Sequence, residues 1–167
     1  MNIEPVGPLA IKLKVLSPLI REGVIPKPAY ATDGAAAMDL HACIAEPLLI
    51  PAGGRVGVPT GIAFELPGPH VVALVFPRSG LASKHGIALS NAVGVIDSDY
   101  RGEVICLVKN ESAADFQIQP GDRLAQLGFF PVFRGIWEEV DALAETDRGA
   151  GGFGSTGRGI STAEPLK

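Results

Sequence analysis

Short apolar runs, most of them bounded by glycine or proline, fill most of the chain. They recur about every ten residues between turn signals such as Pro-Gly, Gly-Gly and Gly-Pro-His, a spacing typical of β-sandwiches and barrels. The pattern predicts an all-β fold of short antiparallel strands. The predicted strands are Ile11 to Leu16, Val56 to Val58, Ile62 to Leu66, Val71 to Phe76, Val104 to Lys109, Phe116 to Gln119 and Leu124 to Phe130.

Helix is predicted only as a turn or two near Ser79 to Lys84. The 21 glycines and 14 prolines are scattered over all 167 residues, so most segments are interrupted before three helical turns are complete. The length fits one domain, and 47% hydrophobic residues are enough to bury a core. We therefore expect a single domain over residues 1–167, with residues 1–10 as a loosely held extension.

The net charge limits the expected partners, and the two cysteines indicate the redox compartment. The net charge of −4 gives no broad basic surface, which excludes duplex nucleic acid as an expected partner and requires local donors for any anionic ligand. Cys43 and Cys106 have no C-x-x-C partner and lie in apolar segments, as buried free thiols do in a reducing compartment. The N-terminal stretch has no long apolar run. These features predict a cytoplasmic protein with no membrane segment.

A glycine-rich stretch, TDRGAGGFGSTGRG, runs from Thr146 to Gly159. It satisfies G-x-G-x-x-G but lacks the strand, turn and helix context of a dinucleotide fold and the G-K-[ST] of a P-loop. Two interpretations stay open on composition: a disordered tail, or an anion-binding nest of backbone amides supplemented by Arg148 and nearby hydroxyls. Phe153 favours the second, because an exposed ring in a loop is useful where it can stack on a flat ligand.

Five stretches contain nearly all the unusual residue choices. They are AAMDLHA (36–42), PRSGLASKHGI (77–87), NAVGVIDSDYRGEV (91–104), RLAQ (123–126) and RGAGGFGST (148–156). In this order and spacing they resemble the five motifs of the trimeric dUTP diphosphatases (dUTPases). The resemblance implies a jelly-roll of short antiparallel strands with very little helix, assembled as a homotrimer.

The activity implied by this resemblance is hydrolysis of dUTP to dUMP and pyrophosphate. Water would attack the α-phosphate with the assistance of Mg²⁺, lowering dUTP and supplying dUMP for thymidylate synthesis. The resemblance also implies sites shared between subunits. Residues 136–167 would form a C-terminal arm that carries the glycine-rich lid, residues 148–157, to a neighbouring subunit.

Asp97 is the candidate catalytic residue. It follows an apolar pair and precedes a turn, so it is a carboxylate at a strand end, able to take a proton from water in a dry site. The residues alone equally allow a turn-forming aspartate. The resemblance assigns the general base to Asp97, while Ser98-Asp99 has the composition of a hairpin tip.

Base and sugar recognition is expected on either side of that tip. The segments Ala92 to Ile96 and Arg101 to Cys106 are predicted to form a hairpin whose backbone polar groups can pair with the edge of a pyrimidine. The resemblance implies that this pyrimidine is uracil. Tyr100 would lie against the sugar and exclude a ribose 2′-hydroxyl, with a cross-strand aromatic pair as its structural alternative. The substrate-binding residues expected here are Asn91, Val95, Ile96, Tyr100 and Ile105.

The phosphates are assigned by resemblance to two further motifs and the lid. Arg123 and Gln126 lie three apart in a strand, so their side chains leave opposite faces unless a bulge intervenes. Lys84 and His85 are interpreted as solvated loop residues. The residues expected to bind phosphate, or to close over the nucleotide in the case of the lid, are Arg78, Ser79, Gly80, Arg123, Gln126, Arg148, Gly152, Phe153, Gly154, Ser155 and Thr156.

Asp39 is a lone carboxylate among small apolar residues, and burial of an unpaired carboxylate is costly. It therefore needs a cation or a donor. The resemblance gives it an indirect role in Mg²⁺ binding, through water, with direct ligands supplied by the triphosphate. Ala37 stands where the family usually has glycine.

Two other functions compete with this interpretation. A dCTP deaminase has a related fold but needs a glutamate on the outgoing hairpin strand, and Val104 to Val108 contains no carboxylate. A non-enzymatic nucleotide-sensing or partner-binding trimer would be expected to lose the base or the lid, and both are present.

Overall fold

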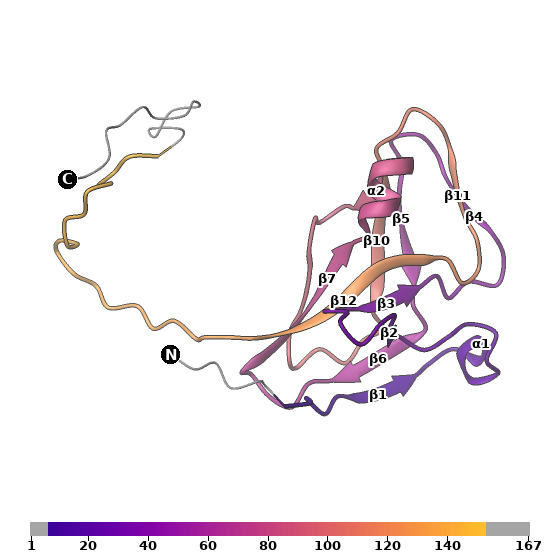
Figure 1. Cartoon of the computed structure of the whole chain (residues 1–167), viewed down its shortest axis with the longest axis horizontal. Helices are drawn as coiled ribbons and strands as arrows, with labels where there is room; N and C mark the ends of the chain where they lie inside the picture. Colours follow the sequence, from indigo (N-terminus) through magenta and orange to yellow (C-terminus); the bar gives the residue numbers. More distant parts are fainter. Residues whose placement is uncertain (1–6, 153–167) are drawn as a thin grey trace. The chain divides into compact units, whose positions relative to one another are not determined.

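The computed structural model describes residues 7–152 (Figure 1). The chain divides into two units, one ending at Arg134 and the other beginning at Gly135. Within the described residues, the helices and strands all belong to the first unit. No helix in the described part is both long and apolar enough to cross a membrane.

Residues 7–134 of the first unit contain twelve strands and two short helices. In chain order they are β1 (Lys12–Val15), α1 (Pro18–Arg21), β2 (Ala29–Tyr30), β3 (Met38–His41), β4 (Leu48–Ile50), β5 (Arg55–Pro59), β6 (Ile62–Glu65), β7 (Val71–Pro77), α2 (Ser79–His85), β8 (Ile87–Leu89), β9 (Gly94–Ile96), β10 (Ile105–Asn110), β11 (Phe116–Ile118) and β12 (Arg123–Pro131).

The strands form four antiparallel sheets. The largest has the order β2-β3-β12-β7-β9, and a second has the order β5-β10-β8; β1 pairs with β6, and β4 with β11. Figure 1 shows β12 running beside β3 and β7. The all-β, jelly-roll prediction is confirmed, and each of the seven predicted strands corresponds to an observed one.

Alternate side chains of one strand, β10, point to the core and to the candidate site. In β10 the side chains of Cys106, Val108 and Asn110 are buried, whereas Ile105 and Leu107 are exposed. Period-two alternation therefore presents one apolar face to the core and another to an open cleft. Both cysteines are free and buried as predicted, and burial raises the pKa of Cys106 to about 12.

The predicted hairpin between residues 92–96 and 101–106 is wrong. The first segment contains β9, which pairs with β7, and the second leads into β10, which pairs with β5 and β8. The two strands therefore belong to different sheets. The turn between them was predicted correctly, and Ser98 and Asp99 form its middle. A gap between the two sheets, rather than a ladder of hydrogen bonds, separates β9 from β10.

The turn between β5 and β6 gives a test of packing in the core. Gly61 has φ +72°, and a Cβ there would lie 2.8 Å from Ile20 Cδ1 and 2.5 Å from Cys43 Sγ. Gly61→Ala is expected to lower the free energy of unfolding by about 2–4 kcal/mol, because overpacking adds to the cost of positive φ. Gly53 has the same φ in open space, so Gly53→Ala should cost about 1 kcal/mol. Urea unfolding checks the difference, and equal losses would contradict it.

Candidate active site

A cleft of about 310 Å³ opens between β9 and β10. It is lined by two strands from different sheets and by the turn that joins them. Six residues predicted to belong to the site line it together: Asn91, Val95, Ile96, Asp97, Tyr100 and Ile105. Val75 in β7 and Leu89 at the end of β8 also line the cleft.

Asp97 lines this cleft. It directly follows β9 and begins the turn closed by the bond from Tyr100 N to Asp97 O at 3.2 Å. Its side chain is exposed, and no hydrogen bond or ion pair from the described residues reaches its carboxylate. The carboxylate is therefore available to accept a proton from water. To act as a general base it would also need a covering element that keeps other water out.

The backbone of β9 provides the second feature of the cleft. β9 is the edge strand of the five-stranded sheet and pairs on one side with β7. An edge strand leaves N–H and C=O groups unpaired on its free side. A flat heterocycle with donors and acceptors along one edge could pair with these groups as a further strand would.

Tyr100 forms the wall of the cleft next to Asp97. Its side chain is 46% exposed, and its Oη donates to the carbonyl oxygen of Glu103 at 3.0 Å. Tyr100 forms no aromatic pair with any residue in the described range. The cross-strand aromatic alternative therefore finds no partner there.

Glu103 is a second carboxylate in the cleft lining, and sequence reasoning missed it. It lies one residue before the segment inspected for a deaminase glutamate. Its Oε1 accepts from the backbone N–H of Gly61 at 2.8 Å. This carboxylate therefore accepts a hydrogen bond that links two turns far apart in the sequence. No local sequence pattern indicates this contact.

Asp39 is held between two arginines. It is 6% exposed. Arg123 Nη1 donates to Asp39 Oδ2 at 3.3 Å, and Arg78 Nε lies 3.2 Å from Asp39 Oδ1, with its N–H not aligned on that oxygen. Arg78 also donates to the carbonyl of Arg123 at 3.4 Å. Two guanidinium groups and one carboxylate leave the cluster with net positive charge, suited to an anion.

A bulge in β12 places Arg123 and Gln126 on one face. The register with β3 shifts between Arg123 and Ala125, so that Arg123 lies opposite His41 and Gln126 lies opposite Asp39. Directly opposed residues project from the same face of a sheet. The bulge that the sequence left as one of two alternatives is therefore present.

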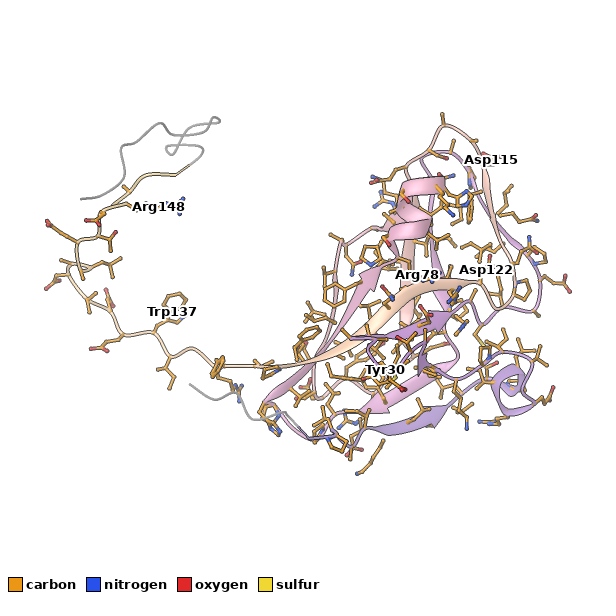
Figure 2. All side chains as sticks on the ribbon, in the orientation of Figure 1. Tyr30, Arg78, Asp115, Asp122, Trp137 and Arg148 are labelled. Carbon is orange, nitrogen blue, oxygen red and sulfur yellow. The ribbon has the colours of Figure 1, made fainter. Side chains whose placement is uncertain are left out.

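Arg78 and Arg123 line a second pocket, of about 290 Å³. Figure 2 shows Arg78 and Asp122 in this region. His85 also lines it and packs on Phe116 with ring centroids 5.2 Å apart. Ser79 and Gly80 begin α2 directly after Arg78, and the space around Gly80 is open. This second pocket shares no lining residue with the cleft at Asp97.

His41 is a titratable neighbour of this cluster that the sequence did not single out. Its Nδ1 is buried without a hydrogen-bond partner from the described residues. Burial lowers the pKa of His41; the Asp39 carboxylate opposes this, and the two arginines add to the lowering. The imidazole is thus kept neutral beside the arginines, and it adds no charge to the cluster.

No three His, Cys, Asp or Glu side chains gather as a metal site within the described residues. Both oxygens of Asp39, the carboxylate expected to act indirectly on Mg²⁺, already face guanidinium groups. The donor set fits an ion that takes its direct ligands from a bound triphosphate rather than from protein side chains.

The second unit carries the glycine-rich segment. Arg148 Nε donates to the carbonyl of Gly151 at 2.9 Å, and Gly149 has φ +49°. Trp137 is fully exposed (Figure 2). Gly152 is the last described residue, and the predicted lid residues Phe153, Gly154, Ser155 and Thr156 lie outside the described range.

Comparison with known proteins gives a consistent result. Residues 23–157 match the family model described as dUTPase. The deoxyuridine 5′-triphosphate nucleotidohydrolase of Desulfitobacterium hafniense is 53% identical over 149 residues, which cover 89% of this chain and 97% of that protein. The enzyme of the same name from Legionella pneumophila is 49% identical over 148 residues, with the same coverage.

Solved structures agree on the fold. A variant of the Staphylococcus bacteriophage 80alpha dUTPase, with dUpNHpp, superposes with a TM-score of 0.78 at 22% identity, covering 89% of this chain and 99% of that one. A variant dUTPase from phage phi11 of S. aureus, described for the coordination of a structural Mg(II) ion, gives 0.69 at 22% identity and covers 80% of this chain and 97% of that one.

Proposed function

The chain belongs to the dUTPase family, and on that premise we propose that it hydrolyses dUTP to dUMP and pyrophosphate in a site shared between subunits of a homotrimer. It is a hydrolase. We also propose how water attacks, how the metal takes part and how the subunits assemble. By the same family premise, the reaction lowers dUTP and supplies dUMP in the cytoplasm.

One observation supports a site formed by residues of more than one subunit. Among residues 7–152, no arginine or lysine lines the cleft that contains Asp97, and Asp97 does not line the pocket that contains Arg78 and Arg123. A nucleoside triphosphate needs both a base pocket with a proton acceptor and a cationic phosphate site. A second copy of the chain, bringing its arginine pocket to this copy's cleft, would supply what each half lacks.

Asp97 would orient and deprotonate the attacking water. A positioned carboxylate that takes a proton in the transition state contributes roughly 10²–10⁴-fold to rate. Its exposure in the single chain supports a role for a covering element. Closure of a lid over the site would exclude other water and leave the nucleophile in place.

Uracil would be recognised along the free edge of β9. Backbone groups of Val95 and Ile96 would match the N–H and C=O pattern of uracil, with Asn91 adding its side-chain amide. Cytosine carries an amino group where uracil has a carbonyl, so it would leave a buried polar group unpaired at a cost of roughly 1–3 kcal/mol. A 5-methyl group would have to be rejected by fit, which is the weaker discrimination.

The phosphates would be bound by Arg78 and Arg123, with Asp39 orienting both guanidinium groups. Ser79 and Gly80 would offer a hydroxyl and approachable amides at the start of α2. Gln126, on the same face as Arg123, would support the pair. The indirect role of Asp39 toward Mg²⁺ stays a prediction, and Mg²⁺ bound to the triphosphate would neutralise part of its charge.

The second unit supports the assembly. Phe133 at the end of the first unit, and Ile136, Trp137 and Leu143 after it, are almost completely exposed. Large apolar side chains left exposed in a group are typical of surfaces that dock another chain. We assign this arm to a neighbouring subunit, where Arg148 and Gly152 would bring the lid residues 153–156 over the nucleotide.

Hydrolysis in ¹⁸O-labelled water tests the reaction. With dUTP and Mg²⁺, mass spectrometry should find the label in dUMP, because water attacks the α-phosphorus; label in pyrophosphate would overturn the mechanism. The same assay with dCTP, dTTP and UTP should show much slower turnover. Deamination of dCTP would favour the rival enzyme class and a chemical role for Glu103.

A further inference from the structure

The Tyr100 side chain folds back over the turn that follows it. Its Oη reaches the backbone carbonyl of Glu103 at 3.0 Å, which brings the ring across Gly102. A Cβ built on Gly102 would lie 2.6 Å from Tyr100 Cζ and 3.1 Å from Cε2, and it would also overlap the hydroxyl oxygen. The position of the ring therefore requires that residue 102 has no side chain.

The carbonyl that receives the Tyr100 hydroxyl is itself anchored. The Glu103 carboxylate accepts from Gly61 N–H at 2.8 Å. The next residue along the chain is also fixed to this turn: Thr60 Oγ1 donates to the carbonyl of Val104 at 2.6 Å, and Val104 N donates to the carbonyl of Ile62 at 2.9 Å. The β5–β6 turn thus fixes the segment on which Tyr100 rests.

We propose that Gly102 and Glu103 are positioning residues that hold the Tyr100 ring at the wall of the Asp97 cleft and thereby set the selectivity for deoxyribose over ribose. The inference rests on the proposed function, because it requires the sugar of dUTP to lie against this wall. Neither residue needs to touch the substrate. Both would act on the sugar indirectly, by fixing the position of the Tyr100 ring.

The physical reason is steric. Ribose and deoxyribose differ by one hydroxyl group, so a rigid wall separates them only if it cannot yield by about the size of an oxygen atom. A ring fixed at its hydroxyl end by Glu103 and packed closely against Gly102 has little freedom to move. A methyl group at residue 102 would push the ring from this position and break the bond to Glu103.

Gly102→Ala is the direct test. The ratio of kcat/KM for dUTP to kcat/KM for UTP is expected to fall by about tenfold or more, since ring displacement in either direction removes the fit to deoxyribose. Gly34→Ala is the matched control, because a Cβ there meets nothing within 4 Å, and its ratio should equal that of the wild type. An unchanged ratio in a folded Gly102→Ala protein overturns the inference.

Glu103 provides a second, independent test. Glu103→Ala removes the acceptor for Gly61 N–H and should lower the same ratio several-fold, whereas Glu103→Gln retains an acceptor oxygen and should restore most of it. If Glu103→Ala and Glu103→Gln show the same ratio of kcat/KM for dUTP to kcat/KM for UTP, Glu103 has a merely structural role and its part of the inference is overturned. If wild-type protein does not hydrolyse dUTP, the proposed function fails before any ratio is compared; if it does, the ratios test this inference alone.

Discussion

Asp97→Asn is expected to lower kcat for dUTP hydrolysis by about 10³-fold, the largest effect predicted for any single substitution. The amide keeps the size of the side chain but cannot accept the proton of the attacking water. Because the Asp97 side chain is exposed and its carboxylate makes no hydrogen bond or ion pair with the described residues, the thermal unfolding midpoint should not change. Pyrophosphate release under saturating dUTP measures kcat, and KM should change little.

Asp99→Asn is the matched control for this substitution. Asp99 lies two residues away in the same turn, carries the same charge and does not line the cleft. Its kcat should stay within about twofold of the wild type, because long-range charge effects at an exposed site are screened. Full activity in Asp97→Asn, or equal losses in the two variants, would remove Asp97 from the role of general base.

Removal of residues 146–167 is expected to lower kcat/KM for dUTP by about 10²-fold, because the lid that covers the nucleotide is lost. If the lid closes on a neighbouring subunit, the truncated chain and Asp97→Asn carry complementary defects. Co-refolding equal amounts should then restore activity in about one quarter of the sites, each combining an intact Asp97 from one chain with an intact lid from another. Pyrophosphate release per subunit measures the recovery.

The control mixture pairs the truncated chain with a truncated Asp97→Asn chain. No lid is present in that mixture, so its activity should not rise above that of the truncated chain alone. Absence of recovery in the test mixture, with mixed trimers demonstrated by mass, would confine each site to a single subunit. Recovery in the control mixture would show that the lid is dispensable.

The sequence identified the longer strands because their apolar runs were bounded by turn residues. β7 and β12 were predicted to within a residue or so of their ends. The strands β2, β3, β4 and β8 were not predicted. Each has only two to four residues, which do not establish an alternation, and none lies inside a longer predicted run as β1, β6 and β11 do. Their existence depends on pairing with distant partners.

The same limitation explains the hairpin error. Two apolar segments around a turn favour a local pairing, but β9 pairs with β7 and β10 with β5. Pairing across the chain is decided by the packing of whole sheets, which the local pattern does not contain. The cleft between β9 and β10 follows from this non-local choice.

For the site, the motifs named residues that the structure brings together, but not their contacts. Spacing alone left Arg123 and Gln126 on opposite faces or beside a bulge, and the bulge depends on the register with β3. The pairing of Asp39 with two arginines and the contact from Glu103 to Gly61 join residues far apart in the chain. Such contacts are properties of the folded state.

The contacts of Asp39 have a consequence for affinity. Arg78 and Arg123 both form ion pairs with this carboxylate within the chain, so part of their rotational entropy is lost when the chain folds. Immobilising a long side chain during association costs roughly 0.5–1.5 kcal/mol. A preorganised guanidinium pair avoids part of that cost, and more of its attraction for a polyanion is retained as binding free energy.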